Sequence, residues 1–289
     1  MYTDIFGKTR YKINLHTHTT VSDGGKTPDE AADIYRSAGY DAIAITDHWK
    51  YGEERVCDNG LLVLSGAEYN IYNVSAKDGL FHVVGVGMDV DPGLDKSASA
   101  QEAINAIKAA GGLAVIAHPA WSLNTPAHIM ALENADATEI YNSVSAVHMS
   151  RRPDSGIIVD MLGAVGRFYP LLATDDVHYY DGSDECVAWI MAEAEECTKD
   201  AILKAVREQK FYATQGPEIH LSIDGDEAVV RCSPCKEIVF LSELVWSPRV
   251  FEGEGITEAR YKIRDGETYI RAEVMDADGK RAWTNCIAF

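Results

Sequence analysis

The sequence predicts an α/β protein in which repeated βα units surround a parallel sheet or barrel, followed by a small all-β region. Short apolar runs alternate with amphipathic stretches through about the first 210 residues. From residue 214 onward, short alternating runs replace this pattern. The dipeptide Gly216-Pro217 favours a break between units, so we expect a hydrolase barrel over residues 1–215 and a β-rich, sandwich-like appendage over residues 216–289.

Strands of the first unit are expected at its short apolar runs, which are residues 13–15, 41–46, 61–65, 81–86, 113–117, 138–141 and 169–173. Helix signals stand between them. Thr27 with Glu30 and Ser99 with Glu102 each form a capping box, and a third helix is expected after Thr198.

The C-terminal unit is expected to form strands at residues 219–223, 228–231, 238–241 and 268–274, separated by Asp-Gly turn dipeptides. Cys232 and Cys235 form a C-x-x-C pattern, but no second pair stands at zinc-ribbon spacing. We interpret this segment as a structural β-turn that contains Ser233 and Pro234. The six cysteines are expected to be reduced thiols.

Composition limits the function. The chain has 289 residues, 46% of them hydrophobic, with a formal net charge of −19. Such a charge repels phosphate backbones, so a nucleic-acid polymer is expected to be an unlikely partner, whereas a small anionic substrate can bind at a metal site. The sequence has neither a signal-peptide pattern nor an apolar stretch long enough to span a bilayer. We therefore expect a cytoplasmic protein without a membrane partner.

Ionisable residues cluster just after the expected strands. In a closed βα barrel the strand ends meet at one face, so these clusters are expected to converge. His82 is the exception, because it lies at the start of its strand and only bending could bring it to the same face. The clusters contain His16, His18, Asp23, His48, Glu68, His118, Asp176 and His178.

Imidazoles and carboxylates together suit zinc, manganese or iron. A lone His-x-His or His-Pro is usually incidental, but six of the nine histidines fall in these clusters or at His82. For His128 and His220 we expect surface or core roles. The sequence does not choose among the three metals.

These motifs resemble the polymerase and histidinol phosphatase (PHP) family of metallohydrolases, in the family's order and over about the first 180 residues. The matching segments are His16-Thr17-His18 with Asp23, Thr46-Asp47-His48, Glu68, His82, Ala117-His118-Pro119 and Asp176-Val177-His178.

The resemblance implies a distorted (β/α)7 barrel with up to three divalent ions. It implies a first ion held by His16, His18, Glu68 and Asp176, and a second held by Glu68, His82 and His118. The third would be held by Asp23, His48 and His178. All nine ligand positions are filled, as expected of an active member of the family.

The tail resembles the carbaryl-hydrolase-like branch of the same family, in residues 211–217, 272–279 and 282–285. This match is shorter and less diagnostic than the first. The branch includes hydrolases of non-phosphate esters, so the resemblance leaves the type of bond open.

Three functions remain in competition. The first is a phosphoesterase that cleaves a small phosphate mono- or diester with a metal-bound hydroxide, with Arg151 and Arg152 as the candidate substrate clamp. The second keeps the metals but hydrolyses a carboxylic ester, carbamate or amide. The third is a non-catalytic binding module stabilised by metals. The sequence does not indicate the exact substrate, the oligomeric state or the role of the β appendage.

Overall fold

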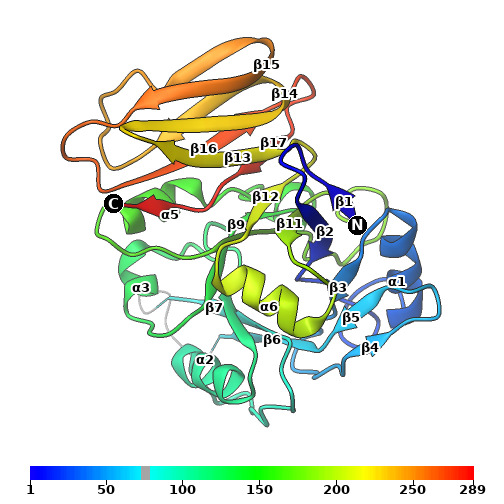
Figure 1. Cartoon of the computed structure of the whole chain (residues 1–289). Coiled ribbons are helices and arrows are strands. Elements are labelled where there is room, and N and C mark those ends of the chain that lie inside the picture. The colour runs from blue at the N-terminus through cyan, green and yellow to red at the C-terminus, as the bar shows by residue number, and fades with distance from the viewer. Residues whose placement is uncertain (73–78) are drawn as a thin grey trace.

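The computed structural model describes residues 1–72 and 79–289, which form a mixed α/β fold with large sheets and short helices (Figure 1). In the described residues the helices are α1 (Pro28–Ser37), α2 (Ala100–Ala109), α3 (Pro126–Met130), α4 (Val144–Val147), α5 (Gly156–Gly163) and α6 (Lys199–Arg207).

Strands occupy all the runs expected in the first unit, together with several that were not expected. In chain order they are β1 (Tyr2–Thr3), β2 (Thr9–Asn14), β3 (Ala42–Ala44), β4 (Arg55–Val56), β5 (Leu62–Leu64), β6 (Gly66–Ile71), β7 (Phe81–Val86), β8 (Leu113–Ile116), β9 (Ala137–Asn142), β10 (Leu171–Thr174), β11 (Trp189–Glu193) and β12 (Phe211–Thr214).

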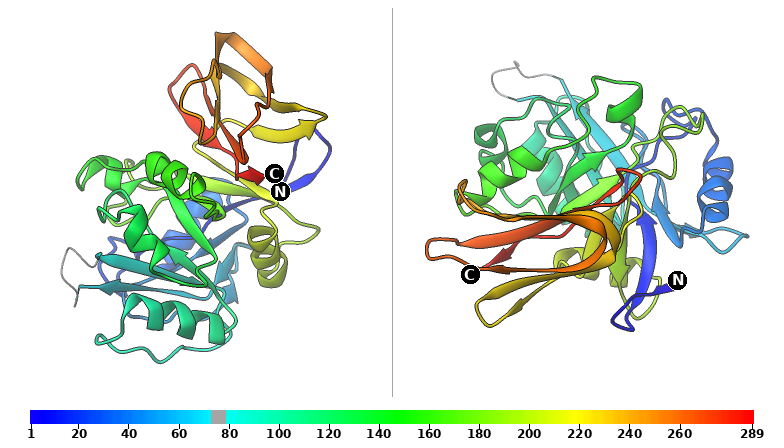
Figure 2. Two further views of the ribbon diagram at one scale, coloured as in Figure 1. Left: turned by 90° about the vertical axis from the view of Figure 1, so that its left-hand side faces the viewer. Right: turned by 90° about the horizontal axis from the view of Figure 1, so that it is seen from above.

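The C-terminal strands continue the same large sheet and project from one side of the body (Figures 1 and 2). They are β13 (Ile219–Asp224), β14 (Glu227–Leu241), β15 (Val250–Lys262), β16 (Tyr269–Met275), β17 (Arg281–Trp283) and β18 (Ile287–Ala288). The division at residues 215 and 216 stays a prediction.

Two sheets organise the described residues. The larger has the order β13-β14-β16-β17-β12-β11-β2-β3-β5-β4, and the smaller has the order β10-β9-β8-β7-β6. A parallel bridge between Thr17 and Val177 joins the chain after β2 to the chain after β10. The α/β class is confirmed, but the described ladders form no single closed barrel, so the seven-stranded closure is not confirmed.

One core nevertheless joins the two sheets. Alternate strand residues from both of them, such as Ile13 and Ala42 in one sheet and Val84 and Val115 in the other, pack in a single buried cluster. The chain passes from one sheet to the other at Gly66, where a Cβ atom would lie 2.6 Å from the carbonyl oxygen of Ile45. The strand ends of both sheets are therefore held around one core.

The helices follow the sequence signals. The capping boxes of α1 and α2 are both present, and α6 follows its cap at Thr198, so these three predictions are confirmed. Each of the three helices buries an apolar face against the sheets, with Tyr35 on α1, Ile104 on α2 and Val206 on α6 fully buried. No helix in the described ranges is both long enough and apolar enough to cross a membrane.

The interpretation of Ser233-Pro234 as a turn is wrong. These residues lie inside the long strand β14, at a shift in register between Arg231 and Cys235 against β15. Proline cannot donate a ladder hydrogen bond, and a bulge is where a strand tolerates it. Cys232 and Cys235 are buried, with their sulfur atoms 3.5 Å apart, and both are free thiols.

Candidate metal centre

The structure brings all nine predicted ligands together at one edge of the two sheets. His16 and His18 follow β2, and His118 follows β8. Short bridges hold the edge, since His48 pairs with Glu68 and Thr17 pairs with Val177. Glu68 lies on β6, which was not expected, rather than in a loop after β5.

His82 reaches this edge without any bending, which corrects the sequence argument. Strand β7 runs antiparallel to both β6 and β8, so its first residues lie beside the last residues of β8. Val83 is the register partner of Ile116, two residues before His118. A strand that runs in the opposite direction presents its start where the parallel strands present their ends.

The first group of ligand atoms consists of His16, His18, Glu68 and Asp176, all buried. The Nε2 atoms of His16 and His18 lie 3.1 Å apart, and each lies 3.1 Å from Oδ1 of Asp176. Oε2 of Glu68 is 3.3 Å from the first nitrogen and 3.0 Å from the second. The four atoms therefore converge on one point.

The second group shares Glu68 with the first. Its other oxygen, Oε1, lies 2.8 Å from Nδ1 of His82 and 3.5 Å from Nε2 of His118. One carboxylate thus faces two groups of ligand atoms, as a bridging ligand does.

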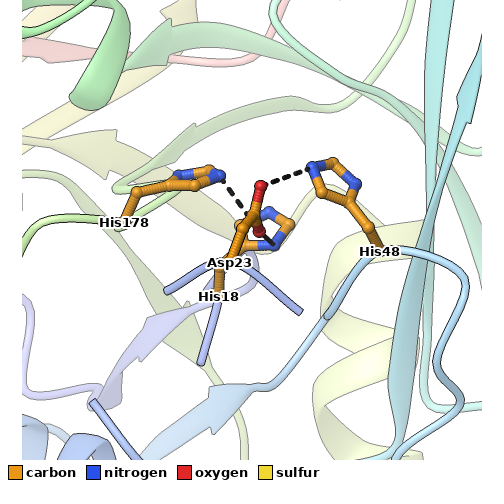
Figure 3. A group of neighbouring side chains, drawn as sticks. All are labelled: His18, Asp23, His48 and His178. Carbon is orange, nitrogen blue, oxygen red and sulfur yellow. Dashed lines mark ion pairs between the residues drawn. The ribbon is translucent and has the colours of Figure 1, made fainter. Parts of the chain in front are cut away.

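The third group surrounds Asp23, whose oxygens lie 3.6 Å from a ring nitrogen of each of His18, His48 and His178 (Figure 3). His18 thus belongs to two groups, which the resemblance did not imply. A neutral imidazole has one lone pair to give. Nδ1 of His18 lies 3.4 Å from the hydroxyl of Ser22, so its Nε2 is the nitrogen available to the first group.

The donor set fits divalent metal ions. In every group the ligand atoms lie within 4.8 Å of one another. Among the described residues, Oδ1 of Asp176 and Nδ1 of His48 are buried without a hydrogen-bond partner. Buried polar atoms are almost always satisfied, and a metal ion would satisfy Oδ1 of Asp176, whereas Nδ1 of His48 lies 3.1 Å from Oε2 of Glu68. Histidine and carboxylate donors suit zinc, manganese and iron.

The pKa shifts in the centre also favour the binding of divalent metal ions. Burial alone would lower the pKa of His16 and of His18, but the nearby carboxylates of Asp176 and Glu68 outweigh this effect of burial. The pKa of His16 is raised well above its ordinary value, and the pKa of His18 is raised to about 9. Burial would raise the pKa of Glu68, but the neighbouring histidines hold it well below its usual range. For His48 burial prevails and lowers the pKa to about 4. The centre is therefore rich in ionised carboxylates.

Sequence reasoning missed Glu139, a buried carboxylate in the middle of β9. Its oxygens lie 2.7 Å from Nδ1 of His16 and 2.8 Å from the backbone nitrogen of His118, and they also accept hydrogen bonds from Asn142 and Thr174. Such a carboxylate fixes the tautomer and orientation of a ligating histidine. A carboxylate in the middle of a predicted strand was the signal that could have identified it.

Two further carboxylates hold the loops of the centre. Asp47 accepts hydrogen bonds from the backbone nitrogen and hydroxyl of Thr19 and from the hydroxyl of Ser22. Asp175 accepts hydrogen bonds from three successive backbone nitrogens, those of residues 186–188, and burial raises its pKa to about 6. Both residues shape the loops rather than face the ligand groups.

The backbone is strained at two predicted ligands. His118 has φ 30° and Asp176 has φ 51°, conformations that residues other than glycine rarely adopt. Gly24 permits the loop that carries Asp23, because a Cβ atom there would lie 2.4 Å from the backbone of His18. The surrounding packing holds these conformations.

A cavity of about 450 Å³ opens over the ligand groups, and most of the predicted ligands line it. Arg151 and Arg152 are exposed and are not among its lining residues, so their clamp role stays a prediction. His128 lies on α3, and His220 lies away from the centre, in a separate group of possible ligand atoms with Asp4 and Glu218, so their surface or core roles stay a prediction. His148 packs at a tilt against Tyr179, which lines the cavity, with ring centroids 3.9 Å apart.

Comparisons with known proteins add information on the fold. No family model matches the chain, and no curated protein matches it. Among solved structures, a two-domain protein from Bacteroides vulgatus, described as containing a predicted PHP-like metal-dependent phosphoesterase, is 17% identical with a TM-score of 0.57. The match covers 99% of this chain and 98% of that one.

Endonuclease Q, in complex with a 27-mer duplex that has an abasic lesion at the active site, is 16% identical with a TM-score of 0.51. The match covers 69% of this chain and 57% of endonuclease Q. The prediction that a nucleic-acid polymer is an unlikely partner is therefore wrong, because a protein of similar fold acts on DNA. Net charge describes the whole surface, whereas a metal centre sets the charge where a phosphate binds.

Neither structure bears on the carbaryl-hydrolase-like branch, which stays a prediction. At this level of identity the similarity concerns the fold alone. The chain is therefore similar in fold to PHP-like metal-dependent phosphoesterases and to endonuclease Q.

Proposed function

We propose that this chain is a metal-dependent phosphoesterase that hydrolyses a phosphate mono- or diester at a centre of three divalent ions. The proposal rests on one observation: three groups of ligand atoms adjoin one another at the floor of a single cavity. Glu68 belongs to two of the groups, and His18 lies between two, with Nε2 facing Glu68 in the first group and Nδ1 facing Asp23 in the third.

The residues have distinct roles. Divalent ions at such a centre would supply a Lewis acid for the phosphoryl oxygens and lower the pKa of a bound water. Glu68 holds the first and second groups at a fixed separation, and Glu139 orients His16. Asp23 draws His48 and His178 together in the third group.

No lysine or arginine lines the cavity in the part of the chain that the structure describes. Bound ions would therefore supply the positive charge that holds a phosphoryl group. We expect metal-free protein to be inactive, and we expect activity to return with manganese, zinc or iron.

The test is a side-by-side assay of the metal-free and reconstituted chain on p-nitrophenyl phosphate, bis(p-nitrophenyl) phosphate, p-nitrophenyl acetate and a DNA duplex with an abasic site. Metal content is measured in the same samples. His82→Asn should lower activity at least tenfold, in line with the usual cost of disturbing a metal site. His128→Asn, on a histidine away from the centre, should leave it unchanged. Turnover of the acetate alone would overturn the proposal.

Hydrolysis of a carboxylic ester, carbamate or amide is the second candidate, and one observation favours it. An acyl substrate needs no cationic clamp, and the described lining of the cavity contains none. The resemblance of the tail to the carbaryl-hydrolase-like branch agrees with this candidate. The acetate arm of the assay decides between the two.

A further inference from the structure

The cavity has an apolar wall that hydrolysis at the metal centre does not require. In the part of the chain that the structure describes, its lining apart from the predicted ligands consists of Gly25 and Ser145 together with five apolar or aromatic residues. We call these five the apolar wall, and they are Tyr72, Trp121, Val144, Met149 and Tyr179.

The three groups of ligand atoms form a row, because the first group shares a residue with each of the other two and so lies between them. Trp121 lies at the end of this row formed by the second group. The half-buried ring of Trp121 lies edge-on to His118 and His82, with ring centroids 4.9 and 5.4 Å apart. Trp121 is thus fixed against the histidines of the second group.

Tyr179 stands at the other end. It directly follows His178 of the third group, and its ring packs against the tilted ring of His148. Tyr179 is 47% exposed and Met149 is 40% exposed, although both line the cavity. Apolar side chains left in contact with water beside a reactive centre lose that contact when a ligand packs on them.

The charges of the lining limit which part of a substrate can bind beside the metal centre. Among the described residues, the charged side chains of the lining are all predicted metal ligands, and the apolar wall carries no charged side chain. Aromatic side chains bind flat rings by stacking, and many different flat rings can stack on the same side chain. The part of a substrate that extends beyond the ester group therefore meets aromatic and apolar surface.

We propose that Trp121 and Tyr179, one at each end of the row of ligand groups, are two alternative faces for an uncharged planar ring in the alcohol part of the substrate, so that the enzyme selects esters with an aryl group or a nucleobase. This inference rests on the proposed phosphoesterase function and adds the substrate class. It assigns specificity to two residues outside the ligand groups.

The test compares esters matched in everything except the flat ring, using the metal-loaded full chain. Benzyl phosphate is compared with cyclohexylmethyl phosphate, and thymidine 5′-monophosphate is compared with 2-deoxyribose 5-phosphate. We expect kcat/KM to favour the planar member of at least one pair by about tenfold, the usual effect of one stacked ring. The pair that shows the preference identifies the source of the ring as aryl or nucleobase.

The double variant Trp121→Leu/Tyr179→Leu should reduce that preference to about twofold or less, because leucine keeps apolar bulk but removes the ring face. Trp121→Phe should keep most of it. The control is Trp246→Leu, since Trp246 is 91% exposed and lies outside the cavity. A structural defect would lower both members of a pair equally, and that result, or no preference in the wild type, would overturn the proposal.

Binding gives a readout that needs no turnover. Calorimetric titration with benzylphosphonate and cyclohexylmethylphosphonate should show the same preference in the wild type and its loss in the double variant. If the preference appears in binding while no phosphate ester is hydrolysed, the phosphoesterase function fails and the role of the apolar wall stands. Equal affinities for the two phosphonates, with hydrolysis present, would overturn only the role of the wall.

Discussion

Glu139→Gln tests whether a carboxylate outside the ligand groups sets metal affinity. Each oxygen of Glu139 faces two donors: Oε1 lies 2.7 Å from Nδ1 of His16 and 2.8 Å from the hydroxyl of Thr174, and Oε2 lies 2.8 Å from the backbone nitrogen of His118 and 2.9 Å from Nδ2 of Asn142. A glutamine presents one oxygen and one NH2 group. The less costly orientation turns its NH2 group toward His16 and Thr174, because the hydroxyl of Thr174 can accept a hydrogen bond and only Nδ1–H of His16 then faces another donor.

The magnitude follows from that one lost bond. A buried donor left without a partner costs about 1 to 3 kcal/mol, and the free energy of unfolding should fall by that amount. A carboxylate behind a ligating histidine contributes about 10- to 100-fold to metal affinity. We therefore expect at least about tenfold weaker binding of one ion, while the ligand atoms themselves stay in place.

Competition with a chelator of known affinity measures metal binding, and denaturant unfolding of the metal-free chain measures stability. Separate measurements are needed because a metal ion also stabilises the folded state. Glu133→Gln is the matched control, since Glu133 is an exposed glutamate outside the centre. If Glu139→Gln binds every ion with wild-type affinity, the proposed orientation of His16 by Glu139 is refuted.

Three other changes test the centre. His82→Asn should reduce bound metal by one ion per chain, measured by elemental analysis, and an unchanged content would exclude His82 as a ligand. Gly24→Ala should displace the loop of Asp23 and lower kcat/KM at least tenfold, because its Cβ would lie 2.4 Å from backbone. Gly52→Ala, whose Cβ would have no neighbour closer than 3.8 Å, is the control. The double substitution of Arg151 and Arg152 by alanine should change kcat/KM less than about twofold, because both are exposed and outside the cavity lining; a tenfold loss would restore them as a clamp.

Local signals in the sequence predicted the strands and helices that position the centre. Capping residues at Thr27 and Ser99 mark helix starts, because they satisfy backbone groups within one turn. The geometry of His82 was not predictable in this way. Whether a strand runs parallel or antiparallel to its neighbours depends on long-range pairing, and the pattern of apolar residues in β7 is the same for both directions.

Glu68 and Glu139 show two different limits of prediction from the sequence. Glu68 was identified through a motif, but its strand was missed because only Ser65 separates β5 from β6. Glu139 belongs to no motif that we used, and its role follows from partners on three other segments, at His16, His118 and Thr174. Contacts between distant segments are a property of the folded chain.

The error about nucleic acid has a physical origin that also affects the choice of substrate. A net charge of −19 is a sum over the whole chain, whereas binding of a phosphate depends on the potential at the cavity. Within the proposed centre, three divalent ions would carry twice the charge that Asp23, Glu68 and Asp176 neutralise. The local sign would then be positive only when the ions are bound. Removing the metal should therefore abolish the binding of benzylphosphonate as well as turnover, and binding that persists in metal-free protein would show that the chain itself recognises the anion.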